Sequence, residues 1–148
     1  MFLAILSLVF FVNPEQQAAT KGYWIGLNDI IHNFNKTVNM RPGLAVDEIK
    51  KSVAKIRSMS TRNVDSLVLI YAEKRIQLAM DYAEFLQETN FASEEYLFKA
   101  EYSIKRQKQK LENVQKRFQE LAERHRHMDA EQEILVSYLR EKFDLDVK

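Results

Sequence analysis

Residues 97–142 decide the fold: LFKAEYSIKRQKQKLENVQKRFQELAERHRHMDAEQEILVSYLREK, with no glycine and no proline. A seven-residue repeat can be written along the whole stretch, and ten of its fourteen a and d positions are apolar. The a positions are Leu97, Ile104, Leu111, Phe118, His125, Gln132 and Leu139, and the d positions are Ala100, Gln107, Val114, Leu121, Met128, Leu135 and Lys142. This narrow seam predicts one long coiled-coil-like helix within 93–148. His125 and Gln132 interrupt the seam, and polar residues at such positions often set register or oligomer state.

The rest of the chain reads as shorter helices. Apolar residues spaced by three and four predict helices over 23–38, 46–58 and 64–89. Pro42 followed by Gly43 predicts a turn between the first two, and Thr89-Asn90 is expected to end the third, the most apolar of them. Because few residues join 64–89 to the last helix, these two are expected to form an antiparallel hairpin. We therefore predict an all-α fold, a small helical domain with a long C-terminal helix that forms a helical hairpin or coiled coil.

Composition argues for binding rather than catalysis. The chain has 148 residues, 46% apolar and 29% charged, with only three glycines, two prolines and no cysteine. Few glycines and prolines argue against a sandwich or barrel, and they leave no glycine-rich phosphate loop. The absence of cysteine removes disulfides, thiolate metal sites and cysteine nucleophiles. No serine elbow or His–Asp arrangement stands out, so we expect no enzyme, no cofactor and no metal site.

The N-terminus carries an uncharged apolar run, FLAILSLVFFV, over residues 2–12. Eleven residues fall short of the roughly 20 needed to cross a bilayer as a helix, but they fit the apolar region of a signal peptide. Pro14 is expected to break the helix after this run. We predict a signal peptide or membrane anchor over 1–19, a compact helical domain over 20–92 and the long helix over 93–148. If so, the protein is periplasmic or secreted, and it is either free or held at a membrane through residues 2–12. The other interpretation of the run 2–12 is a helix buried in the core.

The seam of the long helix needs a partner: helix 64–89, a second copy of the chain, or another protein. Helix 64–89 would span about 39 Å and residues 94–142 about 73 Å, at 1.5 Å per residue. This overhang predicts a homo-oligomer through 97–142 or a protein partner. The residues proposed to contact a partner are Tyr23, Trp24, Leu111, Phe118, Leu121, His125 and Met128. For Trp24, a place in the core is the competing interpretation.

Charge along the long helix is uneven. The stretch 99–117 is basic, and 120–146 is rich in acids, although the formal net charge of the chain is only +1. A solvated helix face, or antiparallel pairing with a second copy, explains this pattern more simply than an anionic partner. No row of aromatic residues interleaves with the basic ones, so nucleic acid is not expected as a partner.

Three short motifs in the N-terminal half resemble a known family. They are Gly22-Tyr23-x-x-Gly26-x-x-Asp29, Arg41-Pro42-Gly43-Leu44, and Asp65-Ser66-Leu67-Val68. Together they are similar to the Rap/Tai-type immunity family, small exported helical proteins that bind and block peptidoglycan amidases delivered by type VI secretion. The resemblance covers roughly residues 22–76.

Two features depart from that family. Its members carry a disulfide with one cysteine just before the Gly-Tyr pair and one before the Pro-Gly turn, where this chain has Thr20-Lys21 and Asn39-Met40. The long helix after Ser93 has no counterpart there. The resemblance implies an exported binding protein that inhibits a toxin enzyme. The alternative is a membrane-anchored coiled-coil adaptor.

Overall fold

The computed structural model describes residues 13–98 and 104–145. Within them lie α1 (Pro14–Asn35), the short 3-10 helix η1 (Lys36–Asn39), α2 (Pro42–Ser58), α3 (Ser66–Phe98) and α4 (Ile104–Phe143). No strand occurs among the described residues, and α4 is 40 residues long. The predicted all-α fold with a long C-terminal helix is therefore confirmed.

The first two helices begin earlier than predicted, and a proline opens each of them. Asn13 caps α1 by accepting a hydrogen bond from the Glu15 N–H at 2.9 Å, and Pro14 occupies the first turn. Pro42 and Gly43, predicted to form a turn, are instead the first residues of α2, after an extended Arg41. Proline is favourable at a helix start because its missing N–H would have no partner there. The apolar run 2–12 lies outside the described residues.

Helix α3 does not end at Thr89-Asn90, as the sequence suggested, but continues to Phe98. The Thr89 hydroxyl donates to the carbonyl oxygens of Phe85 (2.9 Å) and Leu86 (3.1 Å), so this polar side chain is satisfied inside the helix. Ser93, where the long helical segment 93–148 was predicted to begin, lies within α3. With 33 and 40 residues, α3 and α4 span about 50 and 60 Å, and the large overhang predicted for the last helix is not found.

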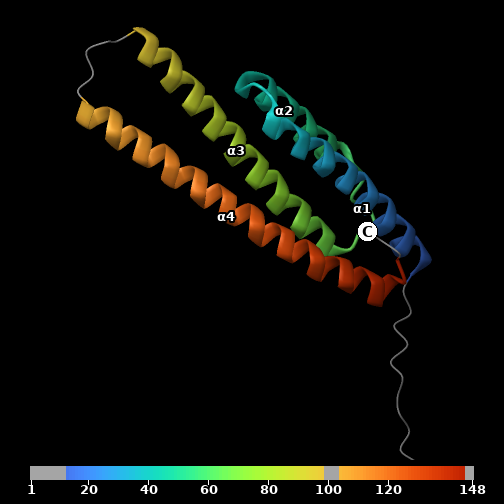
Figure 1. Ribbon diagram of the computed structural model, residues 1–148. Coiled ribbons are helices and arrows are strands. Elements are labelled where there is room, and N and C mark those ends of the chain that lie inside the picture. Colours follow the sequence, from blue (N-terminus) through green and yellow to red (C-terminus); the bar gives the residue numbers. More distant parts are fainter. Residues whose placement is uncertain (1–12, 99–103, 146–148) are drawn as a thin grey trace, which may run out of the picture.

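The helices are arranged around α3 (Figure 1). Helix α4 runs antiparallel beside it, while α1 and α2 pack as a pair along the first part of α3. The far part of the α3–α4 hairpin extends past this pair. Within the described residues, no helix combines the length and apolar character needed to cross a bilayer.

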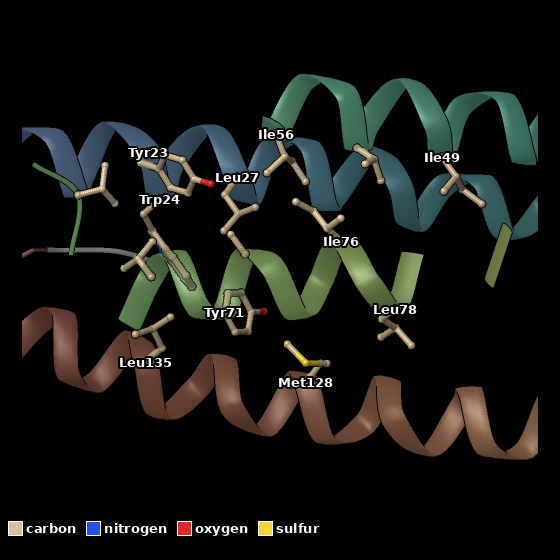
Figure 2. Packing of buried hydrophobic residues seen from close by; sticks show 14 of the residues in the cluster. Tyr23, Trp24, Leu27, Ile49, Ile56, Tyr71, Ile76, Leu78, Met128 and Leu135 are labelled. Atoms are coloured by element: carbon tan, nitrogen blue, oxygen red, sulfur yellow. The ribbon is translucent and has the colours of Figure 1, made fainter. Parts of the chain in front are cut away.

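One apolar core draws on all four α-helices. Trp24 and Leu27 of α1, Ile49 of α2, and Val68 of α3 have no exposed surface, and Phe143 at the end of α4 is 1% exposed. Figure 2 shows side chains from α1, α2 and α4 converging on α3. The division of the chain at residues 19 and 92 stays a prediction, and both boundaries fall inside helices.

Candidate protein-binding groove

The apolar seam of α4 packs against α3 of the same chain. Leu121, Met128 and Leu135, which are d positions of the predicted repeat, are each buried. Met128 and Leu135 point from α4 toward α3 in Figure 2. Of the three partners considered for the seam, helix 64–89 is therefore the one that covers these positions.

Ion pairs fix the register of the hairpin along one flank. They are Lys74–Glu131 at 2.8 Å, Asp81–Arg124 at 2.6 Å, Arg117–Glu84 at 3.1 Å and Arg117–Glu88. Each step of seven along α3, from 74 to 81 to 88, matches a step of seven back along α4, as in an antiparallel coiled coil. A slip by seven residues would oppose Lys74 to Arg124, or Asp81 to Glu131. Exposed pairs contribute at most about 1 kcal/mol each, so they select register more than they add stability.

A buried arginine crosses the hairpin on its other flank. Arg75, only 6% exposed, donates from Nε to the Tyr71 hydroxyl (2.6 Å) and from Nη2 to Asp129 Oδ1 (2.9 Å) and Gln132 Oε1 (3.0 Å). The Tyr71 hydroxyl in turn donates to Gln132 Oε1 at 2.9 Å. Burial raises the pKa of Tyr71, although the nearby Arg75 acts in the opposite direction. The net increase keeps the Tyr71 hydroxyl protonated. Gln132, a polar interruption of the seam, thus has a matching partner in α3.

An apolar groove opens where α1 ends, between α1, α3 and α4. It encloses about 190 Å³ and is lined by Phe34, Asn35, Leu78, Tyr82, Phe118, Leu121, Ala122 and His125. The Tyr82 ring meets Phe34 edge-on at 6.3 Å, and Phe118 lies 6.2 Å from Phe85. Phe118 is 53% exposed. A concave surface rich in aromatic side chains is suited to burying apolar groups of a partner.

His125 stands at the polar edge of this groove. His125 also lines a second, smaller pocket between the helices. Phe34 and Leu78 likewise line both this pocket and the groove. The Nδ1 atom of His125 lies 3.4 Å from Arg75 Nη1 and its Nε2 lies 3.7 Å from Asp129 Oδ2. The groove therefore combines apolar walls with a half-exposed imidazole beside the Arg75 network.

The structure separates the residues predicted to bind a partner. It brings Phe118, Leu121 and His125 together at the groove. Leu111, 67% exposed, lies further toward the start of α4. Met128 is buried against α3, as described above.

Tyr23 and Trp24 lie in the core, 6% and 0% exposed, so a partner cannot reach them in this conformation. The Trp24 ring packs at 5.7 Å from Tyr71. Its buried Nε1 has no hydrogen-bond partner among the described residues. For Trp24, the structure favours the core interpretation.

Sequence reasoning missed the groove residues of α1 and α3. Phe34, Leu78 and Tyr82 have the spacing of ordinary core residues, so nothing in the pattern distinguishes them. The groove exists because α1 ends at Asn35 while α3 continues, and the end of a helix is the feature that periodicity predicts least well.

The motifs of the family resemblance have structural roles here. A Cβ atom on Gly26 would lie 2.9 Å from the Met59 Cε, so this glycine permits a close contact. A Cβ atom on Gly22 would point into open space, so nothing requires a glycine there. Asp65 caps α3 by accepting from the Leu67 N–H at 2.9 Å. No family model, curated protein or solved structure matches this chain.

Proposed function

We propose that this chain is a binding protein that holds an apolar segment of another polypeptide in the groove between α1, α3 and α4. The observation that carries the proposal is the half-exposed Phe118 within an aromatic, concave lining. A long hairpin with a packed seam and fixed register gives this surface a rigid support, which lowers the entropic cost of binding. We assign no catalytic role to the chain.

The most specific form of this proposal is an exported, immunity-type inhibitor of a toxin enzyme, acting in the periplasm or outside the cell. It is supported by the resemblance of residues 22–76 and by the apolar run at 2–12. A membrane-anchored coiled-coil adaptor is the second candidate, and the heptad-spaced ion pairs between α3 and α4 favour it. In both forms the chain acts through contact with protein.

The proposal is tested by photo-crosslinking from two positions of the full-length chain in its native host. A photoreactive residue replaces Phe118 in one variant and Ile134 in the other, which is 71% exposed on the same helix but is not part of the groove lining. We expect a discrete adduct from position 118 and none from 134. Equal labelling at both positions, or no adduct from 118, would contradict the proposal.

The identity of the crosslinked partner also distinguishes the inhibitor from the adaptor. An inhibitor should be joined to a soluble enzyme whose activity falls when the purified chain is added. An adaptor should be recovered with membranes and joined to a structural partner or to itself.

A further inference from the structure

The smaller pocket beside the groove lies where all four α-helices meet, because each of them contributes to its lining. It encloses about 30 Å³, and most of its walls are apolar. Ser52 of α2, Arg75 of α3 and His125 of α4 give it a polar side. Phe34 and Leu78 form the boundary that it shares with the groove. A narrow recess with polar groups thus adjoins a wider apolar surface.

The Arg75 guanidinium retains hydrogen-bonding capacity at this recess. Its Nε and Nη2 donors are engaged by Tyr71, Asp129 and Gln132. Nη1 carries two N–H groups, and its one contact among the described residues is the 3.4 Å approach to His125 Nδ1. At least one N–H of this buried cation is therefore available to an acceptor that enters the pocket.

The charges around the recess favour an anion. Among the described residues, no carboxylate lines either the groove or the smaller pocket. The side chain of Asp129 is 57% exposed and that of Arg75 only 6%, so water screens the Asp129 charge more strongly than the Arg75 charge. The Ser52 hydroxyl, for which no partner is found in the described part of the chain, is a second donor in the pocket.

We infer that the polypeptide segment held in the groove is a C-terminal end, whose carboxylate enters the smaller pocket. The carboxylate accepts hydrogen bonds from Arg75 Nη1 and the Ser52 hydroxyl, and the first of these is charge-assisted. The apolar side chains that precede it lie in the groove against Phe34, Leu78 and Phe118. The inference rests on the proposed function, because it names the part of the partner that the groove binds.

The size of the pocket favours a chain end over an internal acidic residue. An internal segment has to leave the site as well as enter it, whereas a terminal carboxylate needs space on one side only. The pocket is lined by four helices and encloses about 30 Å³, while the adjoining groove is wider, at about 190 Å³. The narrow part therefore suits the carboxylate and the wide part suits the side chains before it.

The first test maps the adduct formed by the photoreactive residue at position 118. We expect the crosslink within about the last six residues of the partner, since six extended residues already reach about 20 Å. Mass spectrometry of the digested adduct locates it. A crosslink to an internal segment would overturn this inference and leave the proposed function intact, whereas the absence of any adduct contradicts both.

A pair of synthetic peptides isolates the contribution of the carboxylate. The probes are the N-acetylated tripeptide leucyl-leucyl-phenylalanine with a free C-terminal carboxylate and the same tripeptide with a C-terminal amide. Titration of the full-length chain, followed by NMR, should show at least about tenfold tighter binding of the acid, because the amide loses the charge-assisted hydrogen bond to Arg75. Equal affinities, or no saturable shifts with the acid at millimolar concentration, would overturn the inference.

A serine variant tests the pocket without disturbing the hydrogen bonds of Arg75 to α4. Ser52→Ala removes one donor, so binding of the acid should weaken about three- to tenfold while binding of the amide stays unchanged. Ser58→Ala, at an exposed position of the same helix and outside both linings, is the matched control and should alter neither. If Ser52→Ala weakened acid and amide equally, Ser52 would have only a structural role and the proposed carboxylate contact would be wrong.

Discussion

Asp65 forms hydrogen bonds that link α1, α3 and α4. Its N–H donates to the buried Thr20 hydroxyl of α1 (3.0 Å), and Oδ1 caps α3. Its Oδ2 accepts from Tyr138 (3.0 Å) and Lys142 (2.9 Å) of α4. The carboxylate is almost fully buried, so these partners replace the water that a charge would otherwise need.

These contacts set the pH dependence of stability. Burial alone would raise the pKa of Asp65, but hydrogen bonds from Lys142, the Leu67 N–H and Tyr138, with the Lys142 charge, outweigh it, and the net pKa is lowered. A carboxyl with a lowered folded-state pKa stabilises the fold above its unfolded pKa of about 4, and this stability is lost as pH falls through the folded pKa.

We therefore expect Asp65→Asn, which keeps a capping oxygen, to lower the free energy of unfolding by about 1–2 kcal/mol at neutral pH. The difference from the wild type should shrink as the pH falls from about 4 through the lowered folded-state pKa, because the unfolded carboxyl takes up a proton first and the folded one follows. Urea unfolding at a series of pH values measures it, with the exposed Asp47→Asn as control. A difference that stays constant down to the lowest pH would show that the carboxylate charge is not involved.

Little of this residue-scale chemistry was predictable. The cap that Asp65 provides for α3 was not predicted from the sequence. The Asp65 partners Tyr138 and Lys142 lie more than 70 positions further along the chain, so only the packing of α4 against α3 reveals them. Conversely, His125 and Phe118 were singled out because heptad phase is visible in sequence.

At the scale of the helices, the repeat in 97–142 predicted a long last helix, but α4 begins only at Ile104 and Leu97 belongs to α3. Leu121, Met128 and Leu135 are buried d positions, but the a positions Leu111 and Phe118 are exposed. The heptad repeat identifies the a and d positions as one apolar face, but it does not show which of these positions the partner helix covers. The end of α3 was mispredicted because a polar Thr89 can be satisfied by its own helix.

Because α4 packs against α3 of the same chain, alanine variants of α4 are expected to differ clearly in stability. Replacing Leu121, Met128 or Leu135 with alanine should each cost about 2–4 kcal/mol, because each leaves a cavity in the seam. Leu111→Ala should cost less than about 0.5 kcal/mol, since that side chain is mostly exposed. Chemical unfolding of the full chain at two protein concentrations measures both. If a seam variant lost stability only at the lower concentration, the seam would be paired between chains instead.

At the scale of the whole molecule, the all-α class and the hairpin followed from composition and periodicity. The placement of α1 and α2 over only part of α3 did not, because it depends on where α1 ends and the chain turns back. That placement creates the groove and leaves Phe118 half exposed. The candidate surface is therefore a product of helix lengths rather than of any motif.

The most direct test of the account is hydroxyl-radical footprinting of side chains in the full-length protein, comparing its complexed form with the dilute isolated chain. We predict that Phe118 reacts more slowly in the complex, while Ile134, exposed on the same helix but outside the groove, reacts at an unchanged rate. Unchanged reactivity of Phe118, or protection of Ile134 in its place, would contradict the central claim that the groove is the binding surface.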